Sequence, residues 1–372
     1  MLSATDSVEY LVAFAALTWI GALFSPLFGV AGDRLGVRAL LCWTRAAYAL
    51  IAAALTALTL TGTLQPWHAF VLFGISGLMR PSDQALRSVL VGQTMQPEIL
   101  MSGLGLSRMT ADMAKVLGAF AGAGGVALIG MGAAYVIVTL LYVSAFILTL
   151  GVARTRSHAP NASAARAVHR LAEAAHYVWR KPDLLGAFSI AFLVNLLAFP
   201  FVLGLLPYAA REVFDVGQTG LGYMAAAFAF GALAGSLTVG SSTLALRAGR
   251  TMLASSGVWF IAVLAFGQTR SLTLGLALLF LCGVVQSFCM APLAAVMLRA
   301  SREDMRSRVM GIRVLGIWGL PLGLVASGPV IAHAGYSACT VLYAGLGLIA
   351  TLVVAYRWRG ALWHTAAPAN SI

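Results

Sequence analysis

Long apolar runs recur along the whole chain and are separated by short polar segments. Because a helix needs about 20 mainly apolar residues to cross a bilayer, each run predicts one membrane-spanning helix. Charged or turn-forming residues bound eleven such runs: 8–30, 39–61, 66–87, 101–125, 127–152, 184–207, 219–241, 251–267, 271–298, 309–333 and 337–356. The 39 glycines and 12 prolines are spread through apolar stretches without the alternating pattern of membrane strands. We therefore expect an all-α polytopic membrane protein.

The overall composition supports this class and excludes others. Hydrophobic residues make up 60% of the chain and charged residues 10%, against about 45–50% and about 25% in soluble domains. Soluble enzymes, secreted disulfide scaffolds and DNA-binding domains are therefore excluded. The sequence contains no phosphate-binding G-x-x-x-x-G-K-[ST] loop, H-E-x-x-H pair or nucleophile elbow, so neither an ATP-driven pump nor an enzyme is expected. The 4 cysteines and 6 histidines are not spaced as metal ligands, so no metal or other cofactor is expected.

The distribution of positive charge predicts the orientation in the membrane. The net charge of +12 is scattered through short loops, so nucleic acid is not an expected partner. With successive loops assigned to alternate sides, 17 of the 24 lysines and arginines lie on the side of a long linker, residues 154–183, and only Arg211 and Arg270 lie on the other. Because lysine and arginine in short loops favour the cytoplasm, we expect the linker and the C-terminus there and residues 1–7 outside. A bacterial inner (cytoplasmic) membrane is the expected location.

The two halves of the chain contain an internal repeat. At one constant offset of 205, Glu98, Arg108 and Gly118 match Glu303, Arg313 and Gly323. Residues 7–38 pair less closely with residues 219–250. Under this register the second half has six helices and the first has five, because no first-half segment pairs with 184–207. We therefore expect the natural protein to begin about 25 to 40 residues upstream, with one more helix.

The expected domains follow from this repeat. Residues 1–153 form an N-terminal bundle of five helices, residues 184–358 form a C-terminal bundle of six, and residues 359–372 form a cytoplasmic tail. The linker of residues 154–183 joins the bundles. Its residues 162–179 are expected to form an amphipathic helix on the membrane surface.

A short motif follows the first predicted helix. The segment GVAGDRLGVR has the pattern G-x-x-x-D-R-x-G-x-R, formed by Gly29, Asp33, Arg34, Gly36 and Arg38. It resembles the signature of the major facilitator superfamily, whose members consist of two six-helix bundles joined by a cytoplasmic linker. The runs RPSDQAL at 80–86, LMSGLGLSR at 100–108 and LAEAAHYVWRKPDLL at 171–185 are similar to the branch that contains the enterobactin exporter. The resemblance implies the two-bundle fold with eleven transmembrane helices, the family's second to twelfth, and a missing first helix.

The resemblance also implies a role for the motif. In the superfamily the counterpart of Asp33 lies against the start of the eleventh helix, near which Arg306 and Arg308 fall in this chain. The helix dipole and these cations favour an anion at that place. We therefore expect the five motif residues to form a cytoplasmic gate.

Charged residues inside the spans are the main candidates for function, because a charge at bilayer depth is costly. Two trios follow i, i+3 and i+7 spacing, so each lies on one helical face: Arg80, Asp83 and Arg87, and Arg108, Asp112 and Lys115. Each trio could line a cavity that binds substrate or a proton, with Asp112 the first choice for proton coupling and Asp83 the second. Alternatively, the trios are ionic patches that tie the two helices together. Arg87 is interpreted as a loop residue.

The second half has no acidic residue within a span, and its polar candidates are Asn195, Gln286 and Arg313. Asn195 and Gln286 fall on the helices that correspond to the seventh and tenth of the superfamily, which line its cavity. Each either hydrogen-bonds a substrate or makes an interhelical polar contact. Arg313 is the repeat partner of Arg108, which favours a position facing the cavity.

These features predict an inner-membrane secondary transporter that exports a small organic molecule, such as a siderophore, drug or metabolite. The proton gradient is the expected energy source, the bilayer and the small-molecule substrate are the expected partners, and a monomer is the expected state. Export is implied by the family resemblance alone. Two alternatives remain open: an importer or uniporter of the same fold, and a truncated membrane protein that does not transport and serves at most as a binding or assembly partner.

Overall fold

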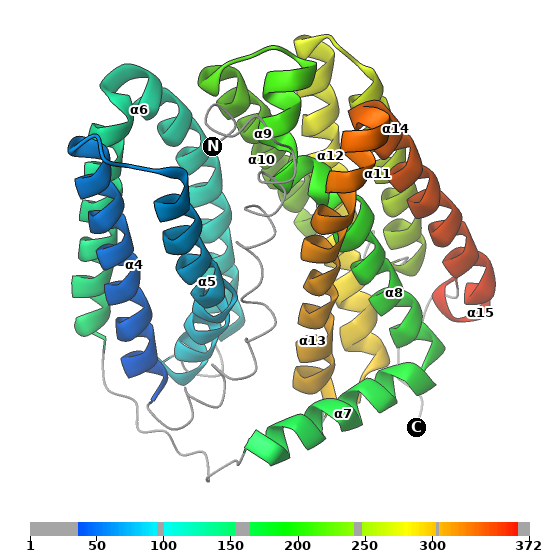
Figure 1. Cartoon of the computed structure of the whole chain (residues 1–372). Coiled ribbons are helices and arrows are strands. Elements are labelled where there is room, and N and C mark those ends of the chain that lie inside the picture. Colours follow the sequence, from blue (N-terminus) through cyan, green and yellow to red (C-terminus); the bar gives the residue numbers. More distant parts are fainter. Residues whose placement is uncertain (1–35, 95–99, 153–163, 242–247, 303–304, 364–372) are drawn as a thin grey trace. The chain divides into compact units, whose positions relative to one another are not determined.

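A computed structural model describes residues 36–94, 100–152, 164–241, 248–302 and 305–363. This part of the chain is helical and contains no strand, as expected for an all-α membrane protein. Seven of its helical segments are long and apolar enough to cross a membrane, and the longest, Arg308–Arg357, contains two spans. Ten of the eleven predicted spans fall on described helices (Figure 1). The first, residues 8–30, lies outside the described residues.

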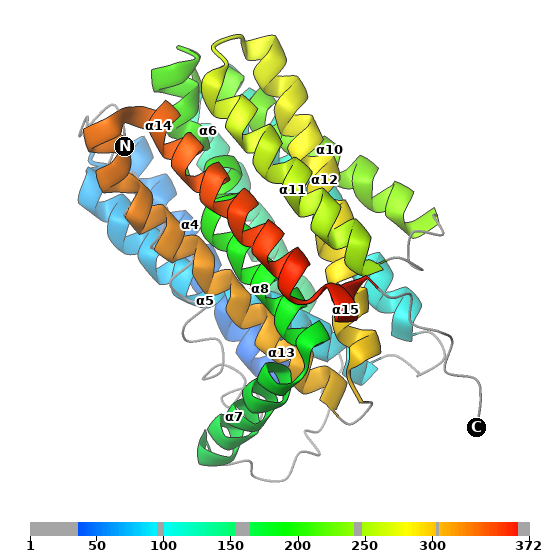
Figure 2. The ribbon, with the colours of Figure 1, turned by 90° about the vertical axis from the view of Figure 1, so that its right-hand side faces the viewer.

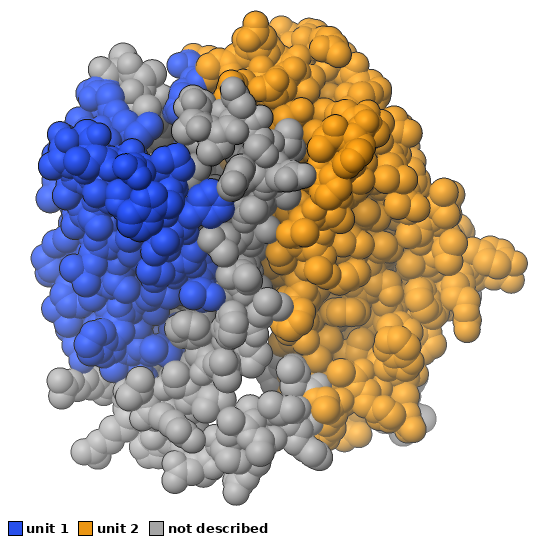
Figure 3. All heavy atoms as spheres, viewed as in Figure 1, with its two compact units in different colours: residues 1–168, 218–222 blue, residues 169–217, 223–372 orange. Residues whose placement is uncertain are grey.

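The chain divides into two compact units (Figure 3). Unit 1 comprises residues 1–168 with 218–222, and unit 2 comprises residues 169–217 with 223–372. The described helices of unit 1 are α4 (Val37–Leu60), α5 (Pro66–Thr94) and α6 (Leu100–Leu150). Unit 2 contains most of the linker helix α7 (Ala164–Arg180) and of α10 (Gln218–Ser241), and all of α8 (Pro182–Leu197), α11 (Ala248–Gln268), α12 (Leu272–Ala300), α13 (Arg306–Leu315), α14 (Gly319–Arg357) and α15 (Arg359–Leu362).

In unit 1 the second half of α6 packs along α4. The hydroxyl oxygens of Thr56 and Thr139 lie 2.9 Å apart, and the rings of Tyr48 and Tyr142 stack with centroids 5.4 Å apart. The α6 chain reverses at Gly130 (Figure 1), whose φ of 79° and ψ of 166° interrupt the helix. Glycine reaches this positive-φ region without a steric penalty, so a single residue replaces a loop. The spans predicted at 101–125 and 127–152 put the break between these two helices at residue 126, four residues before its observed place at Gly130.

The same bend occurs in unit 2. Gly335 has φ 84° and ψ 167° and separates the two spans of α14. Its number exceeds that of Gly130 by 205, which is the offset of the sequence repeat. The bounds of α12 are likewise those of α5 shifted by 206 residues. The internal repeat is thus present in the backbone as well as in the sequence.

Helix α8 forms the centre of unit 2. Leu184, Ala187, Ile190 and Val194 on this helix are fully buried. On its other side α8 meets Gly316, Gly319 and Gly323 of α13–α14. A Cβ at Gly323 would lie 1.9 Å from the Leu196 carbonyl oxygen. Small residues at membrane helix interfaces allow such close approach of backbones, and here they let the two helices pack at backbone contact.

Candidate functional site

The signature motif is only partly within the described structure. Gly29, Asp33 and Arg34 lie outside the described residues. Gly36 precedes α4 with φ 86° and ψ 135°, a conformation that favours glycine. The Arg38 guanidinium donates a hydrogen bond from Nη2 to the carbonyl oxygen of Leu150, at the end of α6. Through this hydrogen bond Arg38 connects the start of α4 to the end of α6. Its positive charge is favourable at that place, because a helix C-terminus attracts cations.

The charged trios of unit 1 lie on continuous helix. Helix α5 runs unbroken through residues 80–87 and α6 through residues 108–115, so the helical spacing expected for both trios holds along the backbone. The side chains of Arg80, Asp83, Arg108, Asp112 and Lys115 lie outside the described part. Their assignment to a cavity or to an ionic patch therefore stays a prediction.

Asn195 is a buried polar side chain in the middle of unit 2. Its Nδ2 donates a 2.8 Å hydrogen bond to the carbonyl oxygen of Ala191, one turn earlier in α8. The amide oxygen makes no hydrogen bond to any described residue. The side chain thus satisfies one donor within its own helix, and its oxygen stays available to a ligand or a water molecule.

Gln286 and Arg313 lie on α12 and α13, which pack against each other and against α8. The Oε1 atom of Gln286 is buried and has no hydrogen-bond partner among the described residues. One turn further along α12, the buried Cys289 thiol is within electrostatic range of the Arg313 guanidinium. A buried acceptor without a partner loses the hydrogen bonds that it makes in water, so such atoms need a specific explanation. Asn195, Gln286 and Arg313 are therefore carried by three mutually packed helices.

Helix α8 continues in an irregular form toward the end of the span. A π-helical segment, Pro200–Gly204, is followed by α9 (Leu206–Tyr208) and by a second π-helical segment, Ala209–Val213. π-Helical turns are rare and occur frequently at functional sites. Pro200, at the first position of the first segment, and Pro207 in α9 are sequence signals for this irregularity, because proline removes one helical hydrogen bond.

Helix α7 is fastened to the ends of α12 and α13 by residues that the sequence analysis did not select. Glu173 accepts a 2.8 Å hydrogen bond from Arg308 in an ion pair, Tyr177 Oη accepts one of 3.2 Å from the Arg302 backbone N–H, and Lys181 Nζ donates one of 3.0 Å to the Ala300 carbonyl oxygen. We call Glu173, Tyr177 and Lys181 the α7 clasp. Glu173 and Tyr177 lie one turn apart on α7, and this was the available sequence signal. Lys181 follows the end of α7 and is the N-cap residue of α8.

The α7 clasp gives Arg308 a carboxylate partner, Glu173. The expected favourable effect of Arg308 on Asp33 stays a prediction, because Asp33 lies outside the described residues. Partial desolvation raises the pKa of the neighbouring Tyr177 hydroxyl, but hydrogen bonds and charges from Lys181 and Arg302 outweigh it and lower that pKa below its usual value. The clasp is therefore an electropositive site with one compensating carboxylate.

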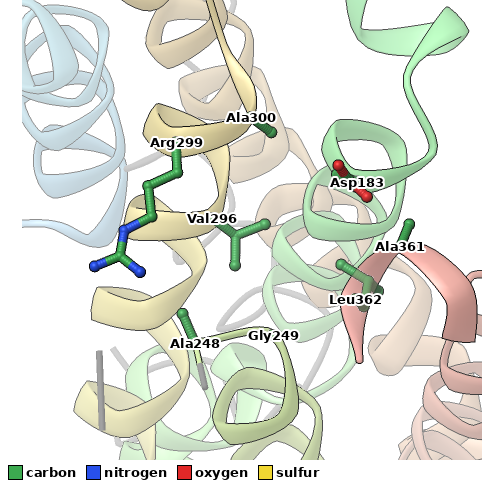
Figure 4. A pocket seen from close by; sticks show the side chains of 8 residues that line it. All are labelled: Asp183, Ala248, Gly249, Val296, Arg299, Ala300, Ala361 and Leu362. Carbon is green, nitrogen blue, oxygen red and sulfur yellow. The ribbon is translucent and has the colours of Figure 1, made fainter. Parts of the chain in front are cut away.

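A pocket lies at the same end of unit 2 (Figure 4). Asp183 at the start of α8, Gly249 at the start of α11, Arg299 near the end of α12 and Leu362 of α15 line it. Transporters of this type bind substrate near the bilayer midplane, between repeats. A pocket at helix ends within one bundle does not meet that requirement, so we do not assign substrate to it.

Comparisons with known proteins agree with this architecture. The profile of the Major Facilitator Superfamily matches residues 4–241. No curated protein sequence matches the chain. The structure is similar to that of the nucleoside transporter NupG, with a TM-score of 0.69 and 15% identity over 96% of this chain and 91% of that one.

Two further solved structures are similar. The D-xylose–proton symporter has a TM-score of 0.70 and 11% identity, covering 93% of this chain and 87% of that chain. The human organic anion transporter MFSD10 (TETRAN) has a TM-score of 0.63 and 19% identity, covering 93% and 83%. At these identities the similarity shows a shared fold.

Proposed function

Because the chain belongs to the Major Facilitator Superfamily, we propose that it is a secondary active transporter that moves a small organic molecule by alternating access of its two bundles. The repeated backbone supports this proposal, since equivalent glycine bends at Gly130 and Gly335 are typical of a transporter built from structural repeats. The similar structures include transporters described as acting on nucleosides, D-xylose and organic anions. A small organic substrate is the class that these have in common.

The observation that carries the proposed substrate site is the buried, unpartnered Oε1 of Gln286. A substrate donor would satisfy this acceptor, and the free amide oxygen of Asn195 would accept from the same molecule. Arg313, on the helix that packs against α8 and α12, would supply positive charge, which favours a substrate with an acidic or strongly electronegative group. Asn195, Gln286 and Arg313 form our proposed substrate contacts in unit 2.

Proton coupling is assigned to unit 1. Asp112 lies between Arg108 and Lys115 on α6, and Asp83 lies between Arg80 and Arg87 on α5. A carboxylate that moves away from a neighbouring cation during rocking gains proton affinity, so either residue can couple proton entry to transport. The existence of a proton symporter among the similar structures is compatible with this choice.

The finer assignment rests on the resemblance to the enterobactin-exporter branch. It favours export across a bacterial inner membrane, with the linker and C-terminus in the cytoplasm.

The test is transport by purified protein in liposomes with an imposed pH gradient. Panels of organic anions, nucleosides and sugars are offered to the wild type, to Gln286→Met and to a control variant. The control is Arg270→Gln, in the loop between α11 and α12, which is not one of the proposed substrate contacts. We expect gradient-driven flux in the wild type and the control, and a flux at least tenfold lower in Gln286→Met. Equal flux in all three proteins would refute the site, and flux no greater than in empty liposomes would favour the non-transporting alternative.

Everted and right-side-out vesicles distinguish export from import. An exporter accumulates substrate in everted vesicles under a proton gradient directed into the original cytoplasm. Accumulation in right-side-out vesicles alone would establish an importer, and equilibration without accumulation in either would establish a uniporter.

A further inference from the structure

Helices α11 and the second span of α14 lie side by side along their length (Figure 2). They run antiparallel, because a Cβ at Gly267 would meet Thr340 and one at Gly347 would meet the Phe260 ring. Beyond the end of α14, a Cβ at Gly249 of α11 would meet the Leu362 carbonyl oxygen of α15. Helix α15 lies at the shared end, where Leu362 also contacts the position of Gly186 on α8.

Each helix of this pair has an exposed apolar stripe at helical spacing. On α14, Ile349 is 61% exposed, Leu352 67% and Val353 59%. On α11, Val258 and Ile261 are also exposed. In a membrane protein such stripes face lipid tails, so acyl chains have continuous apolar surface along both helices.

Both stripes end at an arginine stacked on an exposed aromatic ring. The α11 stripe ends at Arg250, whose guanidinium carbon lies 5.4 Å from the Trp363 ring centroid and whose Nε donates a 3.1 Å hydrogen bond to the Trp363 carbonyl oxygen. The α14 stripe ends at Tyr356, which is 75% exposed and lies 5.3 Å from the Arg359 guanidinium. We call Arg250, Tyr356, Arg359 and Trp363 the α15 surface.

Neither Arg250 nor Arg359 has an ion pair with a carboxylate in the described part of unit 2. Glu173 is paired with Arg308, and Glu212 with Arg211. Asp183 lies beside the α15 surface, in the pocket that Gly249, Ala361 and Leu362 line, and makes no ion pair with either arginine. Aromatic rings at helix ends prefer the headgroup level, and exposed arginines there attract anionic lipids.

We propose that the α15 surface binds the phosphate of an anionic phospholipid, whose acyl chains lie on the exposed stripes of α11 and α14. Arginine matches phosphate geometry with two donors, and the aromatic rings hold both guanidinium groups in place. The close contacts of Leu362 with Gly249 and Gly186 keep α15 against α11 and α8. The bound lipid would thereby link the ends of two helices that pack along their whole length.

The proposal is tested by the thermal stability of the purified full chain in detergent, titrated separately with phosphatidylglycerol, phosphatidylcholine and inorganic phosphate. The variants are Arg250→Gln, Arg359→Gln, their combination, the charge-preserving Arg359→Lys, and Arg270→Gln as a control at the opposite end. Melting without added lipid verifies that each variant is folded. Native mass spectrometry counts the phosphatidylglycerol molecules that each protein retains.

We expect phosphatidylglycerol alone to raise the melting temperature of the wild type. Its half-saturating concentration should rise about fivefold for each arginine removed, from the attraction of one cationic side chain to an anionic surface. Arg359→Lys and Arg270→Gln should resemble the wild type. The proposal is overturned if phosphatidylcholine acts equally well, if the double variant matches the wild type, or if inorganic phosphate alone reproduces the effect, since the site would then bind a free anion.

Discussion

Gly118 in unit 1 and Gly323 in unit 2 are repeat partners with different surroundings. A Cβ at Gly323 would collide with the Leu196 carbonyl oxygen of α8, whereas one at Gly118 would meet nothing within 4 Å. Leu117, next to Gly118, is 64% exposed. The same sequence feature therefore has two physical meanings: at Gly323 it permits close helix packing, and at Gly118 no described helix uses the space. The two positions therefore differ in how closely described helices approach them.

The largest expected effect tests this contrast directly. Gly323→Leu should destabilise the protein by about 3 kcal/mol or more, because the side chain cannot fit beside the α8 backbone. Gly118→Leu should change stability by less than about 0.5 kcal/mol, as is usual for an exposed position. Unfolding of the detergent-solubilised variants measures both. Equal losses in the two variants would show that the α6 face is covered in solution.

Transport separates the proposed roles of the two units. Asp112→Asn in unit 1 should abolish proton-driven accumulation while leaving substrate exchange partly intact, because the substrate contacts are untouched. Arg313→Gln in unit 2 should reduce both accumulation and exchange, by about tenfold or more, since it removes a charged contact to the substrate. Counterflow and gradient-driven uptake in liposomes measure the two activities. If Asp112→Asn keeps the pH dependence of the wild type, Asp112 is not the coupling residue and Asp83 takes its place. The same result for Asp83→Asn would refute proton coupling through either carboxylate.

The α7 clasp is expected to have a smaller effect, because its ion pair is partly exposed. A double-mutant cycle of Glu173→Gln and Arg308→Gln should give a coupling free energy of about 0.5 kcal/mol, which falls as salt is added. Unfolding curves at low and high salt provide the measurement. A coupling of zero would indicate that α7 is held by Ala174 and Val178, which are buried, and not by charge.

The smallest expected effect concerns the motif arginine in unit 1. Arg38→Gln should cost about 0.3 to 1 kcal/mol, because it removes a cation from the C-terminus of α6. Arg38→Lys should recover part of that loss. Hydrogen exchange at the end of α6 is the suitable readout, and unchanged protection there in both variants would show that the Leu150 contact does not stabilise the helix end.

Much of the fold was predictable, because an apolar run of about 20 residues predicts where a membrane-spanning helix lies. The predicted bounds of α10, α11 and α12 differ from the observed ones by at most three residues. Helix α5 was predicted to end at residue 87 but continues to Thr94, because a helix does not stop where its apolar run stops. The π-helical segments after Pro200 were not predictable, since the sequence shows the proline but not how neighbouring helices accommodate it.

The candidate site was predictable to a smaller extent. Intramembrane polar residues are rare, so Asn195, Gln286 and Arg313 could be selected without a structure. Whether a polar atom has a partner depends on packing between distant segments, and so the unpartnered Oε1 of Gln286 could not be predicted. For the same reason the ion pair between Glu173 and Arg308 could not be predicted.

Alternating access of the two units is the central claim, and a pair of distance measurements tests it most directly. Spin labels are placed at Thr61→Cys and Arg270→Cys, on the side away from the linker, and separately at Gly151→Cys and Arg357→Cys, on the linker side, with Cys42 replaced by Ser. Double electron–electron resonance then records both distance distributions across a pH series in nanodiscs. The account predicts that one distribution shifts to longer distances as the other shifts to shorter ones. Two distributions that stay unchanged, or that lengthen together, would contradict it.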